Sequence, residues 1–360
     1  MAFDRDTFHR QAVKTPSTDD ITEMRSLVIE ALTQEGYHPE RDMTGNVVTT
    51  REATDSGGTH LVLNTHIDTV PPHLTFEQHG DIVQGRGACD AKGALAALID
   101  VFCTASIDAG RLTLAITPDE ETSQFGGEHL AKTLSADGYI VGEPTGLDVC
   151  YAARGGYGGR ITIHGENAHA SDQTDGTNAI RGVTPVLEAL DRYDTERGPG
   201  KHEALGSPTL TPTHVEAGGP LNQVPAECTV SFDRRSVPPE TTQSFFHTLD
   251  SHLAQSLPES YEYEIHPAYP ESPDPDPFVT DTDTQLVEEL AEASGGNIRA
   301  FEATTEASYF ANDAPTVVFG PGVIADADGP VAHAEREYIH RSEIAAATET
   351  IRSTVETILS

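Results

Sequence analysis

The chain has 360 residues, of which 58 are Asp or Glu and 22 are Lys or Arg, so its formal net charge is −36 at pH 7. A surface this acidic repels nucleic acids and anionic membranes, and we expect neither as a partner. The length and the 37% of hydrophobic residues suit two compact domains, each with its own core.

The N-terminal residues 1–16 carry charges and no apolar run of the kind that a signal peptide needs. No stretch of the chain approaches the roughly 18 apolar residues of a membrane span. The four cysteines, at positions 89, 103, 150 and 228, are dispersed and form no CxxC pair, which is typical of free buried thiols in a reducing compartment. We therefore expect a cytoplasmic protein.

The acidic residues are spread along the whole chain rather than gathered in a tail, which indicates a solvated acidic surface. Repulsion among these charges is screened by salt, since the Debye length falls from about 30 Å at 0.01 M to about 3 Å at 1 M. We therefore predict adaptation to high salt, with an unfolding temperature that climbs steeply from low to molar KCl. A flat response in thermal unfolding would mean that the acidic surface has another purpose.

The first part of the chain alternates helix and strand signals. Residues 19–35 place apolar side chains at helical spacing, and residues 61–63 form the short apolar run of a strand covered on both faces. Residues 91–105 are apolar at nearly every turn and predict a buried helix, followed by core strands at 112–116 and 139–141. This alternation predicts an α/β sandwich.

The segment 159–268 has a different order of elements. It predicts strand 160–164, helix 178–190, strands 209–215 and 228–235, helix 241–253 and strand 261–265. This β-α-β-β-α-β order is that of a ferredoxin-like domain. Four glycines between positions 155 and 159 precede it and the proline-rich run 267–277 follows it, so we expect an inserted domain with hinges.

The α/β pattern resumes after the inserted segment, with a helix at 282–294, a strand at 316–319 and a helix at 342–359. The catalytic domain is therefore expected to be split in sequence. Its first part is predicted at residues 1–158, the inserted domain at 159–268 and its second part at 269–360.

Residues that bind metals follow the predicted core strands or precede the buried helix. They are His66 and Asp68 in NTHIDTVPP, Asp90 in GRGACDAKG, Glu120 and Glu121 in TPDEETS, and Glu143 in IVGEPTG. The carboxyl ends of strands form the ligand crevice of open α/β sheets, so these side chains should converge. A histidine with several carboxylates suits zinc, with cobalt or manganese as substitutes.

A site with two metals needs a bridging carboxylate and a second histidine. That histidine is predicted to be His333, in GPVAHAEREYI after the strand at 316–319. Each motif alone has an ordinary structural explanation, because HxD pairs and acidic runs are common on protein surfaces. The ordered set is what indicates a metal centre.

The motifs HIDTVP, GRGACDAKG, PDEETS, GEPTG and AHAEREYI together resemble one family. It is the co-catalytic zinc family of acetylornithine deacetylase, succinyl-diaminopimelate desuccinylase, aminoacylase and the carboxypeptidase G type. The resemblance runs from about residue 16 to the C-terminus. It implies a catalytic α/β domain with an inserted ferredoxin-like dimerisation domain, a homodimer, and two Zn²⁺ ions per chain that Co²⁺ can replace.

The resemblance also implies a role for each residue of the metal centre. His66 and Glu143 would bind one zinc ion, Glu121 and His333 the other, and Asp90 would bridge both.

Three further features of the metal centre follow from the same resemblance. Asp68 would hydrogen-bond the His66 ring and fix its tautomer. Glu120 would be the general base that takes a proton from water and delivers it to the leaving amine. The peptide bond between Asp90 and Ala91 would be cis.

In the inserted domain, His169 lies where the family has a histidine that enters the partner subunit's active site and binds the oxyanion. Asn222 in NQVPAE and Arg235 in SFDRR lie where the family contacts the substrate carboxylate. Arg234 and Arg235 point to opposite faces of a strand, and the motif favours Arg235. Arg154 in AARGGYGG is a further candidate for an anion contact, and an ordinary surface arginine is the alternative. Residues 170–173 replace the serine-proline stretch of many family members, so the local loop is not predicted.

The expected function is hydrolysis of the amide of an N-acyl amino acid, as in the biosynthesis of arginine or lysine. The segments ATTEASYF and PTVVFGPG favour an acetylornithine deacetylase, with a succinyl-diaminopimelate desuccinylase as the near alternative. A di- or tripeptidase or a generic aminoacylase comes next. A non-catalytic dimeric binding protein would have lost Glu120 or a metal ligand, and this chain retains them all.

Overall fold

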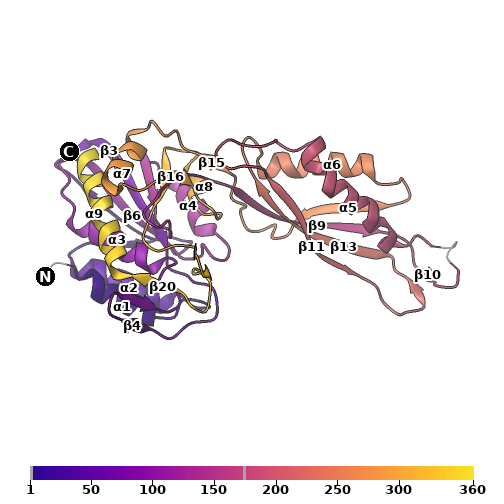
Figure 1. The fold of residues 1–360 in the computed structure, drawn as a ribbon, viewed down its shortest axis with the longest axis horizontal. Helices are drawn as coiled ribbons and strands as arrows, with labels where there is room; N and C mark the ends of the chain where they lie inside the picture. Colours follow the sequence, from indigo (N-terminus) through magenta and orange to yellow (C-terminus); the bar gives the residue numbers. More distant parts are fainter. Residues whose placement is uncertain (1–2, 173–175) are drawn as a thin grey trace. The chain divides into compact units, whose positions relative to one another are not determined.

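The computed structural model describes residues 3–172 and 176–360 and divides into two compact units (Figure 1). The first unit runs up to Ala152 and also includes Val279–Phe301 and Thr305–Ser360. The second unit comprises Ala153–Phe278 and Glu302–Thr304. The chain therefore leaves the first unit, forms the second, and returns.

A mixed sheet forms the centre of the first unit. Strand β3 (Asp55–His66) pairs in parallel with β6 (Ala109–Thr117) on one side and with β7 (Gly138–Val141) on the other, and β7 pairs in parallel with β17 (Thr316–Val318). The sheet is completed by β1 (Glu40–Arg41), β2 (Val47–Glu52), β8 (Val149–Ala153), β15 (Phe278–Val279) and β16 (Ile298–Ala300). The predicted core strands are thus confirmed and lie next to one another.

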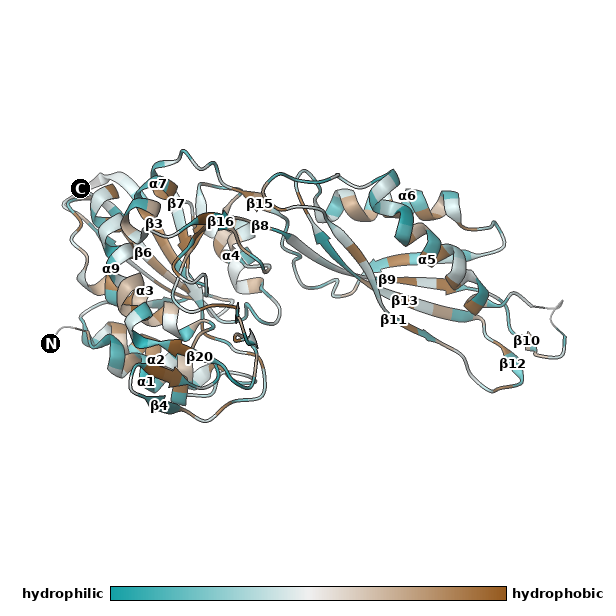
Figure 2. Cartoon of the chain, viewed as in Figure 1, coloured by the Kyte–Doolittle hydropathy of each residue, from teal (hydrophilic) through white to brown (hydrophobic). Residues whose placement is uncertain are grey.

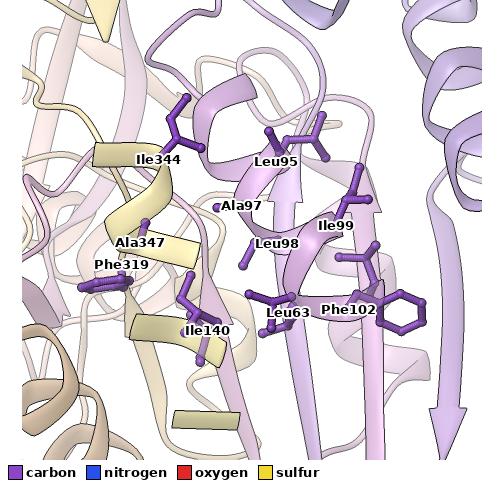
Figure 3. Packing of buried hydrophobic residues seen from close by; sticks show 14 of the residues in the cluster. Leu63, Leu95, Ala97, Leu98, Ile99, Phe102, Ile140, Phe319, Ile344 and Ala347 are labelled. Atoms are coloured by element: carbon purple, nitrogen blue, oxygen red, sulfur yellow. The ribbon is translucent and has the colours of Figure 1, made fainter. Parts of the chain in front are cut away.

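Helices cover both faces of this sheet, which explains why its strands are apolar throughout. Helix α3 (Lys92–Thr104) packs against α9 (Arg341–Ile358), and both cover the strands that carry Leu63 and Ile140 (Figure 3). The next side chain to Ile140, Tyr139, points to the opposite face and stacks on Phe310 of α8 (Ala307–Phe310) with ring centroids 4.9 Å apart. The hydrophobic colouring of the central strands in Figure 2 follows this burial.

The remaining elements of the first unit lie around the central layers. They are helices α1 (Arg5–Lys14), α2 (Thr22–Gln34), α4 (Phe125–Thr133) and α7 (Gln285–Ser294), the small sheet of β4 (Glu77–His79), β5 (Ile82–Gln84) and β20 (Tyr338–His340), and the pair β18 (Ala325–Asp326) and β19 (Gly329–Pro330). Within residues 3–172 and 176–360, no helix is long and apolar enough to cross a membrane.

The second unit has the predicted β-α-β-β-α-β order. Its elements are β9 (Gly155–His164), α5 (Ala179–Glu196), β11 (Thr209–Ala217), β13 (Glu227–Ser236), α6 (Thr242–Ser256) and β14 (Glu262–Pro267). The strands form one antiparallel sheet in the order β11-β13-β9-β14, which is the ferredoxin-like arrangement. A separate short pair, β10 (Ala168–His169) with β12 (Gln223–Val224), carries His169.

The two adjacent arginines of β13 do point to opposite faces of this sheet. Arg234 is fully buried beneath the helices, where its Nε and Nη2 donate to Glu240 at 2.7 and 2.9 Å. The Arg235 side chain is 43% exposed. The exposed arginine is the one that the sequence motif favours for ligand binding.

Candidate active site

The candidate site lies at one edge of the central sheet of the first unit. Strands β3, β6 and β7 are parallel neighbours, so their carboxyl ends meet there. His66 is the last residue of β3, Glu120 and Glu121 follow β6, and Glu143 follows β7. Asp90 comes just before α3. The strand pairing therefore brings His66, the Glu120–Glu121 segment and Glu143 to the same edge, although they are far apart in sequence.

The carboxylate of Asp90 lies between two imidazole rings. Its Oδ1 is 3.2 Å from Nε2 of His66, and its Oδ2 is 3.2 Å from Nε2 of His333. The same nitrogen of His333 is 2.8 Å from Oε1 of Glu121. The peptide bond between Asp90 and Ala91 is cis, as expected. One carboxylate oxygen facing each histidine is the arrangement that a bridging ligand needs.

Two overlapping groups of side chains bring their donor atoms close enough to hold a cation. In the first, donor atoms of His66, Asp90 and Glu121 all lie within 4.8 Å of one another, and in the second those of His66, Glu120 and Glu143 do. Nε2 of His66 is 4.0 Å from Oε2 of Glu143. Distance alone therefore does not separate Glu120 from the acids expected to be ligands.

Asp68 connects the histidine of one strand to the acids that follow the next. Its Oδ1 is 3.2 Å from Nδ1 of His66, whose ring also lies 3.0 Å from the Asp68 carbonyl oxygen. The two carboxylate oxygens also accept hydrogen bonds from the backbone N–H groups of Glu120 and Glu121, each at 3.0 Å. Because both Asp68 groups are acceptors, Nδ1 is the ring nitrogen that donates to Asp68, and Nε2 is the nitrogen that faces Asp90.

The acids of the site are buried beside one another, which is unfavourable without a compensating positive charge. Burial raises the pKa of Glu120 well above its usual range, and the neighbouring Glu143 raises it further. Burial and Asp90 have the same effect on the pKa of Glu143. Hydrogen bonds to Asp90 and Glu121 raise the pKa of His333 to about 10. Four carboxylates and two imidazoles form a donor set that two divalent cations would fit in type and in charge.

Comparison with known proteins identifies the family. Residues 62–357 match Peptidase family M20/M25/M40. The chain belongs to this family. It is 30% identical over 309 residues to an acetylornithine deacetylase of Salmonella typhimurium, a match that covers 80% of this chain and 78% of the relative. An acetylornithine deacetylase of Shigella sonnei is 30% identical over 306 residues, covering 79% of this chain and 77% of that protein. The chain is therefore an enzyme of the M20 hydrolases.

Solved structures of other proteins share the M20 fold. A tripeptidase from Staphylococcus aureus matches with a TM-score of 0.78 at 18% identity and covers 100% of both chains. A Bacillus subtilis protein described as a dinuclear metal binding peptidase from the M20 family matches with a TM-score of 0.72 at 13% identity, covering 99% of this chain and 97% of that one. At these identities the matches show the fold and leave the substrate open.

The other residues predicted for the M20 site belong to the second unit. His169 is exposed, and its Nδ1 accepts hydrogen bonds from the Ser171 hydroxyl at 2.7 Å and from the Ser171 backbone N–H at 3.3 Å. In the neutral ring Nε2 is therefore the N–H donor. The backbone of Asn222 is close to His169, since its carbonyl accepts from the Ala170 N–H at 2.8 Å. Gln173, the last residue of the segment 170–173 that differs from many family members, lies outside the described residues.

The two arginines predicted to bind anions differ in their surroundings. Arg235 forms a bidentate pair with Asp233, at 2.9 and 3.1 Å, on a half-exposed surface. Arg154 donates from Nε and Nη2 to the carbonyl oxygen of Leu205, at 3.0 and 2.6 Å. This contact supports a local structural role for Arg154, and its anion contact stays a prediction.

Two residues next to the candidate metal ligands were not predicted from the sequence, although both lie in the ATTEASYF segment. The hydroxyl of Thr305 donates to Oε1 of Glu143 at 3.2 Å. Glu306 is fully buried and accepts a hydrogen bond from the Thr117 hydroxyl at 2.7 Å, and burial raises its pKa to about 7. A single acid in a segment that carries no other charged residue was the available signal.

Proposed function

We propose that this M20 enzyme is a two-zinc amidohydrolase that removes the acyl group from an N-acyl amino acid, with N-acetylornithine as the preferred substrate class. The placement of Asp90 between His66 and His333 carries the proposal. The 30% identity to acetylornithine deacetylases supports the choice of substrate.

In this proposal, His66 and Glu143 hold one zinc ion, Glu121 and His333 hold the other, and Asp90 serves both. When bound, zinc supplies the Lewis acidity that activates water and polarises the acyl carbonyl. Asp68 keeps the His66 ring in the tautomer that a metal ligand requires, and it fixes the backbone of the Glu120–Glu121 segment at the same time.

Glu120 is the proposed general base. Its backbone N–H donates to Asp68 at 3.0 Å, and its Oε1 accepts from Nε2 of Gln124 at 3.2 Å, so one neighbour holds the backbone and another the carboxylate. A carboxylate in this position takes a proton from the attacking water and returns it to the nitrogen of the leaving amine. That transfer allows the amide bond to break without expelling an anionic amine.

We propose that the enzyme is a homodimer in which His169 stabilises the oxyanion in the partner's site. The hydrogen bonds at Nδ1 leave Nε2–H as the donor, which has no partner among the described residues, and this is the group that such a role requires. Strand β11 lies at the edge of its sheet over nine residues and is largely exposed, so its outer backbone groups are available to a second copy. Asn222 and Arg235 are the proposed contacts for the substrate carboxylate.

A substrate panel in molar KCl with zinc or cobalt tests this function. N-acetylornithine should be hydrolysed with a higher kcat/KM than N-succinyl-diaminopimelate, simple N-acyl amino acids or tripeptides, and a chelator should abolish the activity. A higher kcat/KM for the succinyl substrate or for tripeptides would show that the proposed substrate is wrong, whereas the proposed metal-dependent amide hydrolysis would still hold.

The same preparation should contain two zinc ions per chain. Asp90→Ala should weaken both sites together, because one carboxylate serves both ions. A single ion per chain whose binding is unaffected by this change would refute the two-metal arrangement.

A further inference from the structure

Arg86 and Glu337 form an ion pair that is almost completely buried in the first unit. Nη1 of Arg86 lies 2.7 Å from Oε2 of Glu337, and each residue is 1% exposed. The pairing follows from the small sheet, because β5 and β20 are antiparallel and Gln84 lies opposite Tyr338. A buried ion pair loses about as much hydration energy as it gains in attraction, so stability alone does not explain it.

The second oxygen of Glu337 holds the backbone at Asp90. Oε1 accepts hydrogen bonds from the backbone N–H groups of Cys89 and Asp90, each at 3.1 Å. Asp90 is the residue whose carboxylate lies between the two histidines. Glu337 therefore acts on the peptide that aims this carboxylate, without facing the histidines itself.

The guanidinium of Arg86 holds the backbone at His333. Nη2 donates to the carbonyl oxygen of His333 and Nη1 to that of Ala334, both at 3.3 Å, while Nε donates to the carbonyl oxygen of Pro72 at 3.1 Å. His333 has φ +63°, in the left-handed region that side chains other than glycine rarely adopt. Its backbone therefore needs support from neighbouring groups.

We infer that Arg86 and Glu337 are positioning residues that hold Asp90 and His333 at the spacing that two metal ions require. This inference rests on the proposed function. One ion pair reaches both segments, which are far apart in sequence, and it fixes the backbone next to a proposed ligand on each side. The sequence motifs GRGACDAKG and AHAEREYI contain both residues, but only the structure shows their contact.

The test is zinc affinity, measured by dialysis against graded chelator in molar KCl and by metal analysis. Glu337→Gln should lower the affinity for both zinc ions by roughly 10–100-fold, the scale for residues that orient metal ligands. Both ions are affected because Asp90 serves both. Arg86→Lys keeps the positive charge but loses the planar fork that reaches the carbonyls. Arg86→Lys should mainly lower the affinity for the ion held by Glu121 and His333. It also provides a second test if Glu337→Gln does not fold.

Glu240→Gln is the matched control, since Arg234 and Glu240 also form a buried arginine–glutamate pair, in the second unit, where Arg234 has Asp194 as a further partner. Both glutamine variants should unfold at a lower temperature, but Glu240→Gln should keep wild-type zinc affinity. Equal loss of zinc in this control would overturn the inference, because general destabilisation would then explain the effect. Wild-type zinc affinity in both Glu337→Gln and Arg86→Lys would also overturn it, provided that Asp90→Ala loses zinc. If Asp90→Ala keeps its zinc, the proposed metal site itself is wrong.

Discussion

Replacing Glu120 with glutamine should lower kcat by roughly 10²–10⁴-fold while both zinc ions stay bound. The amide has nearly the shape of the carboxylate, but it cannot take a proton from water at neutral pH. Steady-state kinetics and metal analysis on the same sample measure both effects. This pairing of assays is needed because Glu120 lies in one group of possible ligands with His66 and Glu143.

Glu121→Gln is the comparison that separates a base from a ligand. In the wild-type protein Oε1 of Glu121 lies 2.8 Å from Nε2 of His333, and loss of this carboxylate should remove zinc as well as activity. If Glu121→Gln keeps its metal and Glu120→Gln loses it, the two roles are exchanged.

Removing the imidazole of His169 should reduce kcat by roughly 10²–10³-fold, the scale for one oxyanion donor, if the side chain serves the partner's site. The test mixes two inactive homodimers, His169→Ala and Glu120→Gln, and lets their subunits exchange. In a mixed dimer, one site combines an intact Glu120 with an intact His169, and the other site carries both defects. Random exchange makes half of the dimers mixed, so activity should recover to about a quarter of the wild-type value for a symmetric dimer.

Subunit exchange has to be demonstrated independently, for example with tagged chains that are purified together. Absence of recovery despite exchange would show that His169 acts within its own chain or has a structural role. Recovery above a quarter, up to a half, would show that the subunits exchange preferentially into mixed dimers.

The fold was predictable where the apolar pattern had one simple explanation. The runs at 61–63, 112–116 and 139–141 are core strands, and α3 is the buried helix that the sequence indicates. Helix α1 was not predicted, because residues 1–16 contain no continuous apolar run and the apolar residues of this amphipathic helix are spaced along one face. Phe8 and Ala12 are one turn apart and buried, while the other faces of this helix are charged.

The candidate site was predictable as a list of residues but not as a set of contacts. Motif order and strand ends indicated that His66, Asp90 and Glu121 would converge, and the structure brings their donor atoms together. The double contact of Asp68 and the link from Arg86 to Glu337 depend on the register between segments distant in sequence. No local pattern encodes that register, so these contacts could be found only in the structure.

The split of the first unit has a consequence for how the protein is made. A ribosome completes the continuous segment Ala153–Phe278 before it reaches β17, an interior strand of the central sheet, and His333. The second unit can therefore fold on the emerging chain while the first unit still lacks part of its sheet and His333, one of the two histidines proposed to bind metal. If His333 is a ligand as proposed, loading of the second metal ion must wait until the C-terminal segment has left the ribosome.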